Sequence, residues 1–138
     1  MAASVRKVTY YSTHVPNRAG TAAGVLSELE KAGVNLLAFT GFPEGNASSQ
    51  VDFVPENAAG FTAVARRLKL KMSPKKTGFV VQGDDKPGAV ANVLRRLAKA
   101  RINVTAVDAV CAGKKRFGAI LWVKEKDVTK AKAALGAK

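Results

Sequence analysis

Two short loops of this sequence combine a glycine with side chains that can hold a small charged molecule. The first loop ends in N-R-A-G (residues 17–20) and the second in D-D-K-P-G (residues 84–88). A helical pattern follows each glycine, and the start of a helix presents unpaired backbone N–H groups that attract an anion such as a carboxylate. Glycine at the turn has no Cβ, so a ligand can approach the backbone closely.

The two halves also carry polar groups for the opposite charge of a zwitterion. Asp85 offers a carboxylate to an ammonium group, and Asn103, expected on the neighbouring strand, can both accept and donate a hydrogen bond. Asn17 and Asn35 occupy the matching places in the first half. Together with the anion cradle, these residues suit a small zwitterion. The structural alternative is that Asp and Asn residues here cap helices or shape helix-to-strand turns.

The two loops match because a large part of the sequence occurs twice. The stretch 20–39 returns as 88–107 in a constant register, so that Gly20 aligns with Gly88. The offset of 68 residues is too long for a solenoid repeat and suits a small domain. The predicted domains are residues 1–73 and residues 74–138.

Hydrophobic periodicity predicts the same order of elements in both halves. A strand rich in β-branched and aromatic residues comes first, and a helix with one apolar stripe follows each loop. A second strand, a glycine-containing turn, a third strand and a second helix complete the order. This order predicts an α+β fold of two ferredoxin-like βαββαβ modules in tandem. The expected strands are Lys7–Thr13, Asn35–Phe42, Ser49–Val54, Thr77–Gln82, Asn103–Cys111 and Phe117–Lys124, and the expected second helices are Asn57–Leu68 and Asp127–Leu135.

The fourth strand of each module is the least complete part of this pattern. In the first half Leu70–Met72 can supply a short strand before the linker Ser73–Lys76. In the second half only Gly136–Lys138 follow the last helix, which leaves no room for a strand. The second sheet therefore either has three strands, or its open edge is covered by another segment or subunit.

The loops and the elements around them resemble the ACT domain, a small βαββαβ module that binds amino acids beside metabolic enzymes. The resemblance rests on D-D-K-P-G before the first helix and on R-I-N-V (Arg101–Val104) at the second strand. In the first half, N-R-A-G and G-V-N-L (Gly33–Leu36) are similar to the serine-binding ACT module of phosphoglycerate dehydrogenase, whose N-R-P-G loop and G-V-N turn contact the ligand. Ala19 stands where the family usually has proline.

The resemblance implies a regulatory or sensor protein that binds a free amino acid without a cofactor. It also implies a homodimer, because ACT-like modules commonly pair side by side, and an amino-acid metabolic enzyme as partner. The sequence itself shows no catalytic or metal-binding pattern, since it has one histidine, His14, and no Cys/His/Asp set, so we expect no enzyme activity. The implied ligand-binding residues are Asn17, Arg18, Gly20, Asn35, Asp85, Lys86, Gly88 and Asn103.

The net charge of +13 allows a second interpretation. Residues 1–72 hold eight Lys and Arg against five Asp and Glu, a net of +3. Residues 73–138 hold fifteen against five, a net of +10. Such an asymmetry is typical of a protein that binds nucleic acid or a membrane surface, but a lysine-rich solvated face produces it equally well.

The RNA recognition motif shares the βαββαβ order and supplies the alternative function. Its third-strand pattern is matched in part by K-R-F-G-A-I-L-W (Lys115–Trp122), beside Phe79 on the neighbouring strand. Arg116 replaces the glycine of that pattern, and Ala119 stands where a stacking aromatic belongs. Amino-acid binding is therefore the favoured prediction, and a basic nucleic-acid-binding protein is the alternative.

The remaining composition bears on location. Cys111 is the single cysteine, so no intramolecular disulfide forms, which fits a reducing compartment. A small buried strand residue explains this cysteine as well as a reactive thiol does. No segment reaches the roughly 20 apolar residues of a membrane span, and the N-terminus lacks the apolar run of a signal peptide. We therefore expect a cytoplasmic protein with no membrane partner.

Overall fold

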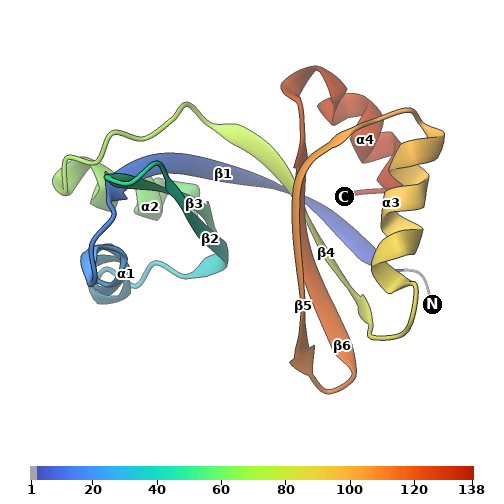
Figure 1. The fold of residues 1–138 in the computed structure, drawn as a ribbon, viewed down its shortest axis with the longest axis horizontal. Coiled ribbons are helices and arrows are strands. Elements are labelled where there is room, and N and C mark those ends of the chain that lie inside the picture. Colours follow the sequence, from blue (N-terminus) through green and yellow to red (C-terminus); the bar gives the residue numbers. More distant parts are fainter. Residues whose placement is uncertain (1–2) are drawn as a thin grey trace. The chain divides into compact units, whose positions relative to one another are not determined.

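The structure is a computed structural model of the 138-residue chain and describes residues 3–138. The described part has an α+β fold of six strands, four α-helices and one 3-10 helix (Figure 1). The strands are β1 Ser4–Pro16, β2 Leu36–Glu44, β3 Ser48–Pro55, β4 Lys76–Asp84, β5 Val104–Gly113 and β6 Arg116–Val123. The helices are α1 Thr21–Lys31, α2 Ala58–Arg67, α3 Ala89–Lys99 and α4 Val128–Leu135, the last preceded by the 3-10 helix η1 Glu125–Asp127.

Apart from the short strand at Leu70–Met72, all predicted strands and helices with stated bounds occur, with small shifts at their ends. The predicted first strand, Lys7–Thr13, is the middle of the longer β1. The predicted last helix begins as η1 and continues as α4 from Val128. Among the described helices, none is long and apolar enough to cross a membrane.

The chain forms two compact units that do not coincide with the two halves of the sequence. The N-terminal unit is Thr9–Lys76, and the C-terminal unit is Thr77–Lys138 together with the N-terminal residues through Val8. Strand β1 therefore belongs to both units, whereas the sequence repeat assigns all of it to residues 1–73.

In the N-terminal unit β3 lies between β2 and β1 and is antiparallel to both. Alternate side chains of a strand reach the same face, and on one face they build an aromatic core. Phe53 and Phe61 are each 1% exposed, with ring centroids 5.1 Å apart, and Tyr11 stacks on Phe61 at 5.4 Å. Leu29 joins this core, so it holds both α1 and α2 to the sheet.

The strand positions that alternate with this core carry a polar network centred on Asp52. Ser12 and Thr40 lie directly opposite Asp52 on the two neighbouring strands. Asp52 Oδ1 accepts from Ser12 Oγ at 2.5 Å and from Gln50 Nε2 at 3.1 Å, and Oδ2 accepts from Thr40 Oγ1 at 3.0 Å. The carboxylate is tolerated at 2% exposure because three donors replace its water.

The segment after α2 lies along β1 without forming a regular strand. Ser73 N donates to Ser12 O at 2.8 Å, and Thr13 Oγ1 donates to Lys71 O at 2.7 Å. Ser12 N donates to the Ser73 hydroxyl at 2.9 Å. The prediction of a strand at Leu70–Met72 is therefore wrong, because side-chain hydroxyls replace part of the backbone ladder.

In the C-terminal unit the strand order is β1 (Ser4–Val8), β4, β6, β5, and β6 is antiparallel to β4 and β5. Helices α3 and α4 lie on one side of these strands (Figure 1). The core between them includes Phe79 and Leu97, both 0% exposed, and Leu135 at 2%. This unit thus has four strands, so the expectation of a three-stranded sheet is excluded.

The first strand of the chain covers the edge that the second half leaves open. Val5 is 5% exposed and belongs to the same core as Phe79. The backbone of Lys138 fixes this segment further, because Lys7 N donates to Lys138 O at 2.9 Å and Lys138 N donates to Val5 O at 3.1 Å. Of the two alternatives left by the sequence, the edge is therefore covered by another segment of the chain.

Candidate functional site

In the C-terminal unit the D-D-K-P-G loop turns the chain from β4 into α3. Gly88 is the N-cap of α3 with φ 85° and ψ 0°, a left-handed conformation that residues with a Cβ rarely adopt. Asp85 N donates to Lys115 O at 2.9 Å, and Ala89 N donates to Lys86 O at 3.1 Å. These two bonds hold the loop in a fixed conformation against the β5–β6 turn.

The first turn of α3 leaves backbone donors unpaired. No side chain caps this helix, and its first turn contains no acidic residue. Within the described residues, the N–H groups of Val90 and Ala91 have no hydrogen-bond acceptor. These groups and the helix dipole attract an anion. Asp85 does not cap α3, so the structural alternative for this residue is not realised.

A pocket of about 310 Å³ lies at this start of α3. The loop and the helix supply one wall with the unpaired N–H groups, and β5 supplies a second, largely apolar wall. The lining residues are Asp85, Lys86, Gly88, Ala89, Val90, Ala91, Ala109, Val110, Cys111 and Phe117. We call this pocket the α3 pocket.

Cys111 joins the two walls of the α3 pocket. Its Sγ donates to Asp85 Oδ2 at 2.9 Å, and the thiol is free and exposed. The bond to Asp85 raises the pKa of Cys111 above its ordinary value, while a backbone bond at Gly113 opposes the shift. In the described part of the chain no donor reaches Asp85 Oδ1, which leaves this oxygen for a cation. Cys111 is exposed on β5, the outer strand of its unit, so the explanation of this cysteine as a small buried strand residue does not hold.

The N-terminal unit repeats the helix start. Gly20 is the N-cap of α1 with φ 87° and ψ −13°, and no side chain caps the helix. The N–H groups of Ala22 and Ala23 have no acceptor among the residues described. A pocket of about 250 Å³, which we call the α1 pocket, lies here. Its lining includes Asn17, Arg18, Thr21, Ala22, Phe39, Gly41, Phe42, Pro43 and Ser49.

The α1 pocket differs from the α3 pocket in its charge. Asn17 takes the place of an acidic residue, and its Oδ1 accepts from Ser49 Oγ at 3.2 Å. Asn17 N donates to Ala47 O at 3.0 Å, which ties the loop to the β2–β3 turn. No carboxylate lines this pocket among the described residues, while Arg18 adds a positive charge. The α1 pocket therefore suits a carboxylate better than an ammonium group.

Asn35 and Asn103 line neither pocket. Asn35 Nδ2 donates to Glu56 Oε2 at 3.3 Å, and Asn35 O accepts from Glu56 N at 2.9 Å, so this residue shapes a turn. Asn103 is exposed just before β5. Each asparagine follows the C-terminal end of an 11-residue helix whose other end forms the pocket, a separation of about 16 Å at 1.5 Å per residue. Their ligand role stays a prediction.

The sequence did not predict that β2 and β5 would line the α1 and α3 pockets. Gly41, Phe42 and Pro43 line the α1 pocket, and Ala109, Val110 and Cys111 line the α3 pocket. The two triplets are related by the same offset of 68 residues as the loops. Extending the repeat register beyond residue 39 would have identified them, although no residue in the two triplets is identical.

The structure argues against stacking of nucleic-acid bases on Phe79 and Phe117. Phe79 is 0% and Phe117 7% exposed, and both belong to the core of the C-terminal unit. Recognition of RNA by this kind of sheet needs exposed aromatic faces. Among the described residues there is also no group of three His, Cys, Asp or Glu that could hold a metal ion.

Solved structures share this fold at low sequence identity. A protein of Bacteroides thetaiotaomicron has a TM-score of 0.79 at 17% identity, covering 97% of this chain and 88% of that one. The regulatory subunit of aspartate kinase from Thermus thermophilus has a TM-score of 0.68 at 14% identity, covering 99% and 95%. The corresponding subunit from Thermus flavus has 0.60 at 15%, covering 99% and 95%.

No family model and no curated protein matches the chain by sequence. The likeness to the two aspartate kinase subunits extends over nearly the whole of both chains. It agrees with the element order and with the glycine loops described above. The chain therefore has the ACT-domain fold of these regulatory subunits.

Proposed function

We propose that the protein is a non-enzymatic regulatory module that binds a free amino acid in the α3 pocket. The observation that carries the proposal is the meeting of two opposite charges in one pocket. The N–H groups of Val90 and Ala91 suit a carboxylate, and Asp85 Oδ1 suits an ammonium group. An amino acid carries both groups on adjacent atoms.

The second wall of the α3 pocket suits the ligand's side chain. Val110 is 68% exposed, and with Ala109 it presents an apolar surface of β5 beside the helix start. Burial of this surface by a ligand is favourable. A volume of about 310 Å³ limits the ligand to a small molecule.

The regulatory part of the proposal rests on the comparisons. Because two of the similar structures are regulatory subunits of aspartate kinase, we propose that this chain acts on an amino-acid metabolic enzyme. In this arrangement the repeats, residues 1–73 and 74–138, are tandem ferredoxin-like modules, and Ser4–Val8 completes the second sheet. The cytoplasm is the proposed compartment, because an exposed free thiol such as Cys111 persists under reducing conditions.

The proposal includes a homodimer that completes the site. Asn35 and Asn103 lie too far from the pockets of their own units to touch a ligand there. In a side-by-side pair the asparagine of one copy would face the loop of the other. Ligand binding at such a seam stabilises the dimer, since the ligand binds only the paired state.

The first experiment is a thermal shift of the full chain with each of the twenty amino acids, followed by calorimetry on those that raise the melting temperature. Asp85→Ala should weaken binding by about 1–3 kcal/mol, because it removes a hydrogen bond to a charged group. Asp84→Ala is the matched control, since Asp84 carries the same charge in the same loop but does not line the α3 pocket. Equal affinities of wild type and Asp85→Ala would refute the site.

Ligand analogues separate the two halves of the site. The hydroxy acid lacks the ammonium group and the primary amide lacks the carboxylate, so each should bind at least about tenfold more weakly than the amino acid. Asp85→Ala should bind the hydroxy acid as well as wild type does. If wild type bound either analogue as tightly as the amino acid, the pocket would not require both charges of a zwitterion.

Substitution of the asparagines tests the proposed contact between the two copies of the dimer. Asn103→Ala should weaken binding by about 1–3 kcal/mol and reduce the dimer fraction that light scattering records with ligand. Asn35→Ala and Asn17→Ala apply the same test to the α1 pocket. A monomer unchanged by ligand, with full affinity in Asn103→Ala, would assign these asparagines to turns alone.

A further inference from the structure

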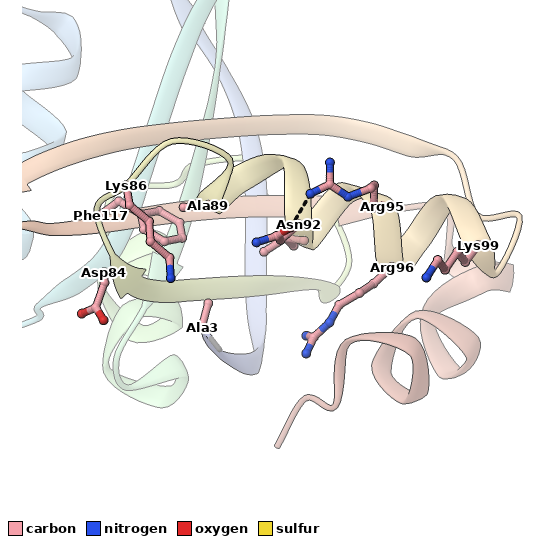
Figure 2. Close-up of a pocket in the computed structure, with 10 residues that line it drawn as sticks. Ala3, Asp84, Lys86, Ala89, Asn92, Arg95, Arg96, Lys99 and Phe117 are labelled. Carbon is pink, nitrogen blue, oxygen red and sulfur yellow. Dashed lines mark hydrogen bonds between the residues drawn. The ribbon is translucent and has the colours of Figure 1, made fainter. Parts of the chain in front are cut away.

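A second pocket beside α3 in the C-terminal unit has four cationic side chains in its lining. It has a volume of about 320 Å³ and lies between the D-D-K-P-G loop, α3 and Ala3. Figure 2 shows Lys86 near the start of the helix and Lys99 toward its end, with the other two cations between them. The four cationic residues are Lys86, Arg95, Arg96 and Lys99. We call this the basic pocket.

Little negative charge surrounds these four side chains. Asp84 is the acidic residue of the lining, and its Oδ1 accepts from Arg116 Nη1 at 2.8 Å. Within the described part of the chain, none of the four cations forms an ion pair. The basic pocket therefore concentrates uncompensated positive charge in the unit that carries most of the chain's excess.

Two of the cations are held in place by neutral partners. Arg96 Nη1 donates to Leu135 O at 3.1 Å, which ties the guanidinium of α3 to the end of α4. Arg95 Nη2 donates to Asn92 Oδ1 (Figure 2). Each guanidinium has five N–H donors, so each keeps free donors for a ligand. Side chains that are already ordered lose less entropy on binding.

The spread of the charges indicates the class of ligand. From Asn92 to Lys99 the helix rises roughly 10 Å, and Lys86 adds a cation beyond its start. One carboxylate or one phosphate group contacts only part of such a row. Arg and Lys are the usual partners of phosphate oxygens. The geometry points to a small anion with two or more linked phosphate groups as the ligand of the basic pocket.

The basic pocket is separate in chemistry from the α3 pocket. It shares Lys86, Ala89 and Phe117 with that pocket but not Asp85 or the first-turn residues Val90 and Ala91. A polynucleotide fits less well than a small oligophosphate. The ring of Phe117 is 7% exposed and offers no face for a base.

Calorimetry of the full chain with inorganic triphosphate, at about 0.15 M salt, tests the assignment. We expect saturable binding of one triphosphate per chain. Replacing two cations in Arg95→Gln/Lys99→Gln should weaken it by about tenfold or more, because charge-assisted bonds are lost. The matched control is Lys130→Gln/Lys132→Gln, which removes the same charge from exposed positions of α4 outside the pocket. It should change the affinity by less than about twofold.

Four results would overturn the assignment. The first is no binding of triphosphate by wild type. The second is an equal loss in both double variants, which would reduce the effect to net charge. The third is an equal affinity for orthophosphate, which would mark a single-phosphate site. The last is tighter binding of a single-stranded RNA oligonucleotide, with the same dependence on Arg95 and Lys99, which would mark a polynucleotide surface. Thermal melting of both double variants checks that the fold is retained.

Discussion

The thiol of Cys111 donates a hydrogen bond to the carboxylate of Asp85, with 2.9 Å between Sγ and Oδ2. This contact links β5 to the loop before α3 and places the chain's single thiol inside the α3 pocket. The hydrogen bond and the negative charge of Asp85 both favour the protonated thiol, so the pKa of Cys111 lies above its ordinary value. The reactivity of this thiol therefore reports on the charge of the proposed ligand site.

Alkylation of Cys111 should titrate at a higher pH than alkylation of an ordinary cysteine. The thiolate is the reactive form, and Asp85→Asn removes the charge that disfavours it, so the midpoint of the rate profile should move to lower pH. The pKa of Cys111 is higher in the folded chain than in the unfolded chain, so the interaction stabilises the folded state below the unfolded pKa. This contribution is lost as the pH rises through the folded pKa. Asp84→Asn should leave the midpoint unchanged. An unchanged midpoint in Asp85→Asn would contradict the hydrogen bond.

The buried carboxylate of Asp52 should be a main determinant of stability in the N-terminal unit. Asp52→Ala removes the acceptor of Ser12, Thr40 and Gln50, and it should lower the free energy of unfolding by about 1–3 kcal/mol in urea titrations. Glu44→Ala is the control, since Glu44 is an exposed partner of His14, and it should cost less than about 0.5 kcal/mol. Similar costs of the two substitutions would mean that the network contributes nothing net.

The first strand should be required for the stability of the C-terminal unit. Val5 is 5% exposed in the core that Phe79 and Leu97 build, and Val5→Ala should cost about 1–3 kcal/mol on thermal or urea unfolding. Hydrogen exchange should also accelerate at the backbone of β4. Arg6→Ala, at the exposed neighbouring position, should have little effect on either measurement. Unchanged exchange in β4 of Val5→Ala would show that this strand does not protect the edge.

A substitution at Gly83 tests the close approach of the N-terminal segment to β4. A Cβ at this position would lie 2.8 Å from Phe117 Cε1 and 3.0 Å from Ala3 Cβ. Gly83→Ala should therefore destabilise the chain by about 1–3 kcal/mol, as overpacking does. Gly24→Ala is the opposite case, because nothing lies within 4 Å of a Cβ there and the residue is inside α1. That substitution should raise the melting temperature, since alanine favours a helix by about 0.5–1 kcal/mol over glycine. A stabilising Gly83→Ala would refute the close packing.

The repeat and its elements could be predicted from the sequence because they depend on neighbours along the chain. Strand and helix periodicities are properties of a few consecutive turns or residues, and the offset of 68 residues relates α1 and α3, which are both 11 residues long. Gly20 and Gly88 are related by the same offset, and both adopt a left-handed backbone conformation, with φ of 87° and 85°. The loop half of the candidate site was predictable for this reason.

Contacts between distant segments were decided by the tertiary structure alone. The repeat predicted two similar modules, but not that Val5, in the first half of the sequence, would enter the core of Phe79. The sequence predicted Asp85 as a ligand residue, but it did not predict the hydrogen bond between Asp85 and Cys111. That contact depends on where β5 lies in the sheet, which is at the outer edge of its unit. Which edge a strand joins depends on the burial and hydrogen bonding of the whole sheet, and no local periodicity carries that information.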